Sequence, residues 1–393
     1  MKNNTPQILC VVGARPNFMK IAPIMRALSA PESGLIGRLL HTGQHYDKAM
    51  KTSFFDQLQI PEPDIDLGVG SGSHAEQTAE IMKRFEPELD KNRPDAVLVV
   101  GDVNSTIACA LVAVKKGIPV IHVEAGLRSG DRSMPEEINR VLTDQISDLL
   151  FTTERSAEDN LVREGIARDK VYFAGNVMID TLLFNLESAV SVKETVRHQC
   201  PGFLEKQEFS DYGLVTLHRP SNVDDEQTLR RLLSVLSEIS QEIPLVFPVH
   251  PRTRQRITDF ALDDMLSAGN FILLPPQGYR EMLGLMKDAR VVLTDSGGIQ
   301  EETTALGVPC ITLRESTERP ITAEEGTNTV VGTDREKIMV AYREVMETGG
   351  KVGRAPEFWD GKAAERIVEV LKSWLNSHQA RGLKSEQQEK AKT

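Results

Sequence analysis

The stretch Pro119-Val-Ile-His-Val-Glu-Ala-Gly-Leu-Arg128 places an apolar run directly before polar and charged residues. A second stretch, Val291-Val-Leu-Thr-Asp-Ser-Gly-Gly-Ile-Gln-Glu-Glu302, has the same order and begins more than 170 residues later. Each apolar run predicts a buried parallel strand, and the polar residues then mark its carboxyl end. Ligands of open α/β sheets bind at that edge. The two stretches therefore predict two ligand-binding sheet edges.

Short β-branched runs alternate with longer segments of helical period along the chain. A first set of strands is expected at Ile8–Val12, Leu39–Thr42, Ala96–Val100, Val120–Val123, Leu149–Thr152 and Val171–Phe173. A second set is expected at Gly213–Leu217, Leu245–Pro248, Phe271–Leu274, Val291–Leu293 and Cys310–Leu313. Helices are expected between them, as at Ser105–Lys116, Pro135–Asp148, Glu226–Ile239 and Arg280–Lys287. This alternation predicts βαβ units and two parallel sheets.

The length of 393 residues allows two domains of ordinary size. We expect them at residues 1–175 and 176–362, with a linker near Gly175–Asp180. An amphipathic helix is predicted at 363–376. The polar residues 377–393, rich in Lys, Gln and Glu, predict a disordered tail.

Charge and cysteine content narrow the possible partners. The formal net charge of −11 opposes nonspecific binding to nucleic acids and anionic membranes, so we expect neither partner. No apolar stretch approaches the roughly 20 residues of a membrane span, and the first residues contain no signal-peptide hydrophobic region. The four cysteines form no CxxC pair. They predict buried thiols in a reducing cytoplasm and no metal site.

The segment Gly13-Ala-Arg-Pro-Asn-Phe-Met-Lys20 joins the first predicted strand to the first helix. A glycine turn lets a phosphate or a sugar approach the backbone, and the helix N-terminus favours negative charge. Arg15 and Lys20 add cations to this turn. The segment is not a GxGxxG dinucleotide fingerprint. Solvated surface charge remains the alternative for both cations.

Ser296, Gly297 and Gly298 start a helix after the second apolar run. Two glycines at such a turn free backbone N–H groups, and the serine adds a hydroxyl, which together suit a diphosphate. Glu302 lies one helical turn after Gly298, where its carboxylate can accept hydrogen bonds from a ribose diol. An ordinary helix start with solvated glutamates is the alternative.

Three carboxylates are candidates for acid/base chemistry at the first sheet edge. Asp102 ends the run Val97-Leu-Val-Val-Gly-Asp102, Glu124 ends a second strand, and Glu136 follows Pro135 at a helix start. A pair with separated pKa values is what proton transfer requires. A capping or salt-bridge role is the alternative for Asp102, and a favourable interaction with the helix dipole is the alternative for Glu136.

His218-Arg219 and His250-Pro-Arg252 each end a strand of the second set. Histidines and arginines at strand ends suit phosphate contact and charge neutralisation. Arg319 is a further candidate cation, for which a structural salt bridge is the alternative. A lone histidine is more often structural, but two at equivalent strand ends favour a site.

Taken together, the motifs closely resemble the non-hydrolysing UDP-N-acetylglucosamine 2-epimerases. The matching segments are GARPNFMKIAP, HTGQHYD, GDVNST, HVEAGLRSGD, MPEEINR, GNVMID, TLHRPSN, PVHPR, TDSGGIQEE and TERP. They run from residue 13 to residue 320 in family order. The resemblance implies a glycosyltransferase-B-like fold of two Rossmann-like domains with parallel sheets facing a cleft. A C-terminal helix then packs back on the first domain.

The resemblance also implies an activity, in which UDP-N-acetylglucosamine and UDP-N-acetylmannosamine are interconverted by inversion at C2. UDP is eliminated to give 2-acetamidoglucal and then adds back, without NAD, metal or another cofactor. A cytoplasmic homodimer is implied, with a UDP-sugar as its partner. By motif position, the implied catalytic residues are Asp102, Glu124, Glu136 and His218. The implied substrate-binding residues are Arg15, Lys20, Arg219, His250, Tyr279, Ser296, Gly297, Gly298, Glu302 and Arg319.

The sequence departs from the family pattern in two places. Members that use a second substrate molecule as an activator bind it through a glutamine-rich stretch and a later arginine. Here Gln44 remains, Asp47 stands at the later glutamine position, and the segment Gly68–Gln77 has no arginine. The chain is therefore expected to work without an activator. The segment His218-Arg-Pro-Ser-Asn222 replaces a commoner His-Arg-Arg-Glu-Asn, which could alter the phosphate or the activator side of the cleft.

Three other functions remain open from the sequence. The nearest is an epimerase of UDP-2,3-diacetamido-glucuronate, which shares these motifs and which an extra cation near the sugar would favour. Another is a UDP-sugar glycosyltransferase of the same fold, which would need an acceptor groove. A noncatalytic nucleotide-sugar sensor belongs to a different class. Buried carboxylates near a diphosphate argue against a sensor, since burying charge is costly.

Overall fold

The computed structural model describes residues 5–43, 54–199 and 211–390. The chain forms two compact units. Unit 1 comprises Met1–Thr181 and Glu357–Thr393, and unit 2 comprises Leu182–Pro356. The first boundary lies inside a helix rather than at residue 175, and the chain returns to unit 1 before the last helix begins.

Unit 1 is built on a parallel sheet, which contains seven strands among its described residues. The strands are β1 (Gln7–Val12), β2 (Ile36–His41), β3 (Ile65–Asp66), β4 (Ala96–Val100), β5 (Val120–Ala125), β6 (Leu149–Thr152) and β7 (Val171–Phe173). Their order is β3-β2-β1-β4-β5-β6-β7. The strand order runs outward from β1 in two directions, to β2 and β3 on one side and to β4 and the later strands on the other. The sheet is therefore doubly wound, and β1 and β4 flank the topological switch point, where ligands bind.

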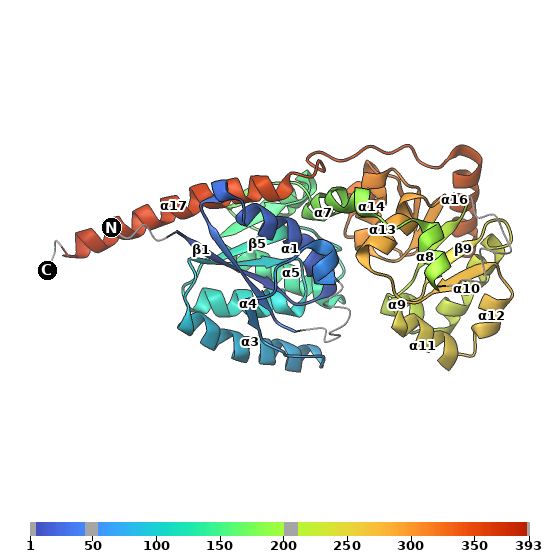
Figure 1. The fold of residues 1–393 in the computed structure, drawn as a ribbon, viewed down its shortest axis with the longest axis horizontal. Helices are drawn as coiled ribbons and strands as arrows, with labels where there is room; N and C mark the ends of the chain where they lie inside the picture. Colours follow the sequence, from blue (N-terminus) through green and yellow to red (C-terminus); the bar gives the residue numbers. More distant parts are fainter. Residues whose placement is uncertain (1–4, 44–53, 200–210, 391–393) are drawn as a thin grey trace. The chain divides into compact units, whose positions relative to one another are not determined.

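Helices cover the sheet of unit 1 (Figure 1). Those described are α1 (Arg15–Leu28), α3 (His74–Lys91), α4 (Asn104–Lys115), α5 (Pro135–Ile146), α6 (Arg155–Arg163) and α17 (Ala363–Lys390), with short 3-10 turns η1 (Pro31–Ser33) and η2 (Arg168–Lys170). The helix α7 (Val177–Asn185) begins in unit 1 and ends in unit 2. β4 is buried along its whole length, as expected for a strand with both faces covered. Val97 and Val99 pack in one cluster with Ile81, Phe85 and Leu89 of α3.

Unit 2 repeats this architecture with six described strands in the order β10-β9-β8-β11-β12-β13, all paired in parallel. The strands are β8 (Gly213–Thr216), β9 (Leu245–Pro248), β10 (Phe271–Leu274), β11 (Val291–Thr294), β12 (Cys310–Thr312) and β13 (Asn328–Val330). The helices are η3 (Leu186–Ser188), α8 (Val192–Gln199), α9 (Pro220–Val223), α10 (Glu226–Ile239), α11 (Pro251–Asp259), α12 (Asp263–Ser267), α13 (Tyr279–Lys287), α14 (Gly297–Leu306), α15 (Pro320–Glu324) and α16 (Arg335–Thr348). The expectation of two Rossmann-like units with parallel sheets is confirmed.

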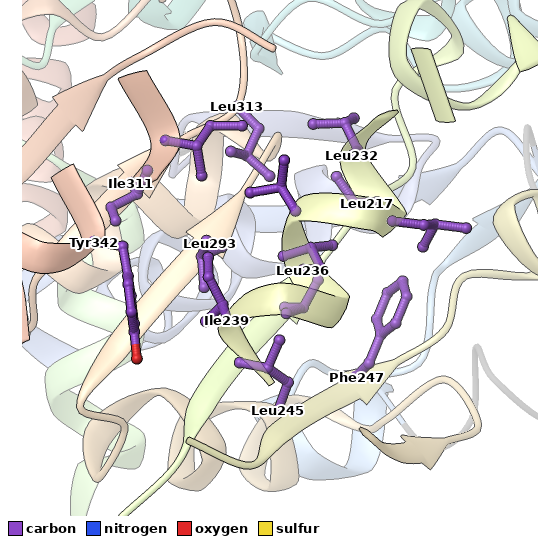
Figure 2. Packing of buried hydrophobic residues seen from close by; sticks show 14 of the residues in the cluster. Leu217, Leu232, Leu236, Ile239, Leu245, Phe247, Leu293, Ile311, Leu313 and Tyr342 are labelled. Carbon is purple, nitrogen blue, oxygen red and sulfur yellow. The ribbon is translucent and has the colours of Figure 1, made fainter. Parts of the chain in front are cut away.

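The core of unit 2 forms between its sheet and helices α10 and α16. Leu236 and Ile239 of α10 are fully buried with Leu293 of β11 (Figure 2). Tyr342 of α16 is fully buried against the same cluster. Burying one leucine or isoleucine contributes about 1.5–3 kcal/mol, so this cluster anchors the strands whose ends carry the polar motifs.

The last helix, α17, packs against α1 within unit 1. Its first N–H groups, from Ala363 and Ala364, donate to the Asp180 carboxylate at 3.1 and 2.7 Å. Asp180 of α7 thereby holds the helix start. α17 continues to Lys390, whereas the sequence predicted a disordered tail from residue 377. The apolar periodicity on which that prediction rested ends near Leu375, but Lys, Glu, Gln and Ala favour helix without it.

Asp180 makes the stability of unit 1 depend on pH. Its burial raises the pKa to about 6, although the N–H groups of Ala364 and Ala363 oppose the rise. The folded chain therefore holds more protons than the unfolded chain between about pH 4 and pH 6. This stabilising contribution is complete below about pH 4 and is lost as the pH rises through about 6.

Asp180→Asn, which cannot titrate, is expected to remove this dependence. Across the same window the wild type should lose up to about 3 kcal/mol of unfolding free energy relative to the variant, since each pKa unit corresponds to about 1.4 kcal/mol. Urea unfolding at pH 4, 5, 6 and 7 measures the difference. Parallel stability curves for the two proteins would contradict the assignment.

Candidate active site

The turn after β1 is tied to the end of β4 by Asn17. Its Oδ1 accepts the N–H groups of Gly13 at 3.2 Å and Ala14 at 3.1 Å, and its Nδ2 donates to the Val100 carbonyl at 3.0 Å. A Cβ on Gly13 would lie only 2.0 Å from the Ser105 hydroxyl. Only glycine fits this turn. The sequence reasoning did not single out Asn17, although it lies inside the quoted GARPNF segment.

Lys20 and Glu124 form a buried ion pair. The Lys20 Nζ lies 2.5 Å from the Glu124 Oε1, and the two side chains are 7% and 1% exposed. Gly101 lies against this pair, because a Cβ there would come within 2.8 Å of the Lys20 Nζ. The structure therefore joins a predicted cation to a predicted carboxylate.

Glu124 itself has unusual backbone geometry. Its φ is +72°, and the pairing of β5 with β6 shifts register between Val123 and Ala125. A non-glycine residue in the left-handed region costs on the order of 1–3 kcal/mol, and such residues gather at functional sites. A bulge of this kind re-aims a side chain at the end of a strand. Here the re-aimed side chain is the carboxylate that binds Lys20.

Asp102 is paired with Arg140 of α5, whose other nitrogen donates to Glu137 at 2.8 Å. Glu137 is buried and accepts the N–H groups of Ser129 and Gly130, both at 3.0 Å. Glu136, the carboxylate chosen from the sequence, is half-buried at the start of α5. The sequence analysis gave no role to Glu137 or Arg140, although both lie in the matching segment MPEEINR.

Arg15 begins α1, and its guanidinium lies 4.3 Å from the centre of the Phe54 ring. Such a cation–π contact holds the planar group in one orientation. Arg15 is half-buried, in contrast to the buried Lys20 one turn later. Both predicted cations of this segment are therefore held by specific partners rather than being fully solvated.

In unit 2, Asp295 organises the end of β8. The fully buried carboxylate accepts the backbone N–H groups of His218 at 3.0 Å and Arg219 at 2.9 Å, and the Asn222 side chain at 3.2 Å. The His218 Nδ1 lies 2.9 Å from the Asp295 Oδ1. Burial by itself would raise the pKa of Asp295, but the His218 ring and these N–H groups hold it below its usual value. Asp295 was quoted in a motif but given no role from sequence.

His250 lies next to His218, with ring centroids 5.7 Å apart. The His250 Nδ1 accepts the Arg252 N–H at 3.2 Å and so caps the N-terminus of α11. That bond leaves the hydrogen of a neutral ring on Nε2. The two histidines predicted from equivalent strand ends are brought together, with different partners on their Nδ1 atoms.

The first turns of α14 carry the glycine turn and the buried Glu302 carboxylate, which is bound by Tyr279 of α13. Tyr279 donates its hydroxyl hydrogen to the Glu302 Oε1 at 3.0 Å, and both side chains are buried. Burial, followed by the Glu302 charge, raises the pKa of Tyr279 well above its usual value, so its hydroxyl stays a donor. Ser296 is the N-cap residue, and Gly297 and Gly298 form the first turn.

Arg319 and Glu318 form ion pairs beside this turn. Arg319 Nε lies 2.8 Å from Glu301, while Glu318 contacts Arg219 at 3.2 Å and Arg314 at 2.8 Å. A Cβ on Gly297 would lie 2.5 Å from the Glu318 carboxylate. Burial would raise the pKa of Glu318, but the surrounding arginines hold it well below its usual range. The Glu318 carboxylate is thus a stable negative charge beside the first turn of α14.

The region that matches the activator-binding segments of other family members is only partly described. Residues Gln44–Met50, which include Asp47, lie outside the described residues. In the described part, Ser71–Gln77 contribute no guanidinium, but Arg84 of α3 donates to the carbonyls of Leu67 and Gly68 at 2.9 and 2.7 Å. Arg84 therefore binds the backbone carbonyls of this segment.

Two wider features concern the described residues alone. No three His, Cys, Asp or Glu side chains among them are grouped so that they could hold a metal ion. Within the same ranges, no helix has both the length and the apolar character needed to cross a membrane.

Cys10, Cys109 and Cys310 are buried free thiols, and burial raises the pKa of Cys10 to about 12.

Comparisons with known proteins agree with this geometry. The family model described as UDP-N-acetylglucosamine 2-epimerase matches residues 30–372. The chain is 45% identical over 365 residues to the UDP-N-acetylglucosamine 2-epimerase of Methanocaldococcus jannaschii, covering 92% of this chain and 97% of that protein. It is 39% identical over 372 residues to the UDP-2,3-diacetamido-2,3-dideoxy-D-glucuronate 2-epimerase of Pseudomonas aeruginosa, covering 93% and 99%.

Solved structures agree as well. The crystal structure of the M. jannaschii UDP-GlcNAc 2-epimerase in complex with UDP-GlcNAc and UDP has a TM-score of 0.84 and 42% identity, covering 93% of this chain and 99% of that one. The Neisseria meningitidis UDP-GlcNAc 2-epimerase bound to UDP-GlcNAc has a TM-score of 0.82 at 31% identity, with coverage of 93% and 99%. On the family match and these identities, the chain belongs to the UDP-N-acetylglucosamine 2-epimerase family.

Proposed function

We propose that this protein interconverts UDP-N-acetylglucosamine and UDP-N-acetylmannosamine by inversion at C2 of the sugar. The observation that carries the proposal is the buried Glu124 carboxylate, set in a left-handed backbone conformation and 2.5 Å from Lys20. Relatives named for this activity span nearly the whole chain, and one was solved with UDP-GlcNAc and UDP. They support the choice of substrate.

The proposed reaction is an elimination followed by re-addition. A carboxylate of unit 1 takes the C2 proton, and the electron pair of the C2–H bond forms a C1–C2 double bond. The C1–O bond breaks, and UDP leaves with its electron pair, giving 2-acetamidoglucal. Protonation of C2 on the opposite face and return of UDP to C1 give the epimer. Asp102, Glu124 and Glu136 are the proposed acid/base groups.

Unit 2 supplies the proposed UDP-binding groups. The backbone N–H groups at Gly297 and Gly298 suit the diphosphate, because helix N-termini favour anions. Glu302, held by Tyr279, accepts hydrogen bonds from the ribose diol. His218 and Arg219 stabilise the charge that develops on UDP as C1–O breaks. Arg15 and Lys20 add positive charge on unit 1, and His250 and Arg319 do so on unit 2.

Proton NMR in D₂O tests the function directly. Purified protein incubated with UDP-N-acetylglucosamine is expected to produce UDP-N-acetylmannosamine, with deuterium at C2 of both sugars. Heat-inactivated protein provides the control. Epimerisation with protium retained at C2 would exclude proton abstraction there, and an unchanged substrate would exclude the activity.

The diacetamido-glucuronate epimerase is a second candidate, because the P. aeruginosa relative is 39% identical and matched over 99% of its length. The same NMR assay with UDP-2,3-diacetamido-glucuronate separates the two. Faster deuterium incorporation into that sugar would reassign the substrate while leaving the reaction class unchanged.

Activity is expected to survive exhaustive dialysis against EDTA with no NAD added. The proposed mechanism moves a proton and a leaving group, so no hydride acceptor is required, and N–H and guanidinium donors meet the charge on UDP. Initial rates before and after dialysis measure the effect, with a buffer-dialysed sample as control. A strict requirement for NAD or a metal ion would overturn the elimination mechanism.

A further inference from the structure

Asp144 of α5 is a fully buried carboxylate that makes three contacts with β5 and the segment directly after it. Its Oδ1 lies 2.6 Å from the His122 Nδ1. Its Oδ2 accepts the Gly126 N–H at 3.1 Å and lies 2.8 Å from an Arg128 nitrogen. His122, Gly126 and Arg128 all belong to the HVEAGLR motif. The acid/base roles proposed above use only Glu124 of that motif.

The contacts extend on both sides of Asp144. The His122 Nε2 lies 2.8 Å from the Gly101 carbonyl oxygen, and the His122 side chain has no solvent exposure. Arg128 donates to both carboxylate oxygens of Glu164, at 2.8 and 2.6 Å. The result is a continuous chain of contacts from Glu164 to the end of β4. His122 faces an acceptor on each side, so it completes a chain of charge-assisted hydrogen bonds with a hydrogen on both ring nitrogens. Such bonds are about twice as strong as neutral ones.

This chain holds the backbone on either side of the proposed acid/base groups. Gly101 directly precedes Asp102 and has a φ of +64°. Gly126 follows Glu124 by two residues and has a φ of +81°. A Cβ on Gly126 would come within 2.4 Å of the Ala157 carbonyl oxygen. Both glycines occupy the left-handed region, so the backbone at these points needs external contacts to keep one geometry.

We propose that Asp144 is a positioning residue for the reaction. Through His122 it holds the Gly101 carbonyl next to Asp102, and through Gly126 it holds the backbone after the Glu124 bulge. The inference rests on the proposed function and deepens it. A displacement of about 1 Å between a catalytic group and its substrate can cost about 10²-fold in rate. Loss of Asp144 should therefore reduce turnover and leave the UDP-binding groups of unit 2 unchanged.

Asp144→Asn tests this directly. We expect kcat to fall about 10²-fold, the rate of C2 deuterium incorporation to fall in parallel, and the Kd for UDP by calorimetry to stay within about twofold. The matched control is Asp180→Asn, which alters another buried carboxylate of unit 1, one that accepts the backbone N–H groups of Ala363 and Ala364. Its kcat should match the wild type wherever both proteins are folded. Equal losses of kcat in the two variants would overturn the inference.

A double-mutant cycle with His122→Gln separates positioning from general stabilisation. If Asp144 acts through His122, the double variant should lose no more turnover than the worse single variant. Losses that multiply would show that the two residues act independently. Should Asp144→Asn not fold, His122→Gln decides the question, because it cuts the link from Asp144 to Gly101 and leaves Asp144 bound to Gly126 and Arg128. Wild-type turnover in His122→Gln would contradict the inference.

Failure of the inference can be told apart from failure of the proposed function. A wild-type protein that leaves UDP-N-acetylglucosamine unchanged in D₂O refutes the function. A wild-type protein that is active, together with a fully active Asp144→Asn variant, refutes only the positioning role.

Discussion

Glu124→Gln is expected to lower the rate of C2 epimerisation by about 10²–10⁴-fold, which is the usual contribution of general acid/base catalysis. The amide retains an oxygen that can accept the Lys20 hydrogen bond now made at 2.5 Å. The left-handed backbone at residue 124 is unaffected by the exchange. The fold should therefore persist while the proton acceptor is lost. The prediction is tested by measuring kcat and the rate of deuterium incorporation at C2 for the variant and for the wild type.

The control is Glu88→Gln on α3, a partly exposed glutamate paired with Lys91. It should keep wild-type turnover. Calorimetry should show UDP binding retained in Glu124→Gln, since the groups proposed to bind the diphosphate and the ribose lie in unit 2. Parallel amide variants of Asp102 and Glu136 complete the series. If all three amides turn over near the wild-type rate, the acid/base assignment is wrong.

The strands that position the site follow from local composition. The predicted bounds of β4 at Ala96–Val100 and β9 at Leu245–Pro248 agree with the structure, because buried parallel strands are short apolar runs that end at polar residues. The two-residue β3 and the polar β13 (Asn328–Val330) were not predicted. Neither offers an apolar run, and each is a strand only because a neighbour provides its hydrogen bonds.

The site shows the same division between local and long-range information. Glu124 and Lys20 could be named because each lies at a strand end or a helix start. Their pairing joins residues 104 positions apart and could not be inferred from sequence. Asp295 and Asp144 were missed for the same reason. Each looks like an ordinary helix or turn carboxylate until its partners, 77 and 22 residues away, are brought to it by the sheet order.

His218→Asn is the second substitution with a large expected effect. The Asp295 carboxylate holds the His218 Nδ1 at 2.9 Å, and the side chain remains 38% exposed. With Nδ1 bound to a carboxylate, the ring donates from Nε2 only when both of its nitrogens carry a hydrogen, so the proposed donor to UDP is the imidazolium form. Its orientation is set before the reaction, because Asp295 is also fixed by the N–H groups of residues 218 and 219. A preorganised donor matters most where charge develops in the transition state.

Loss of such a donor typically raises the barrier by on the order of 3 kcal/mol, or about 10²-fold in rate. We expect that fall in kcat for His218→Asn, with a much smaller rise in the Kd for UDP. His198→Asn makes the same exchange on the exposed end of α8 and should leave both values unchanged. A defect confined to UDP affinity would show that His218 only binds the nucleotide, because an interaction made equally in substrate and transition state does not change kcat.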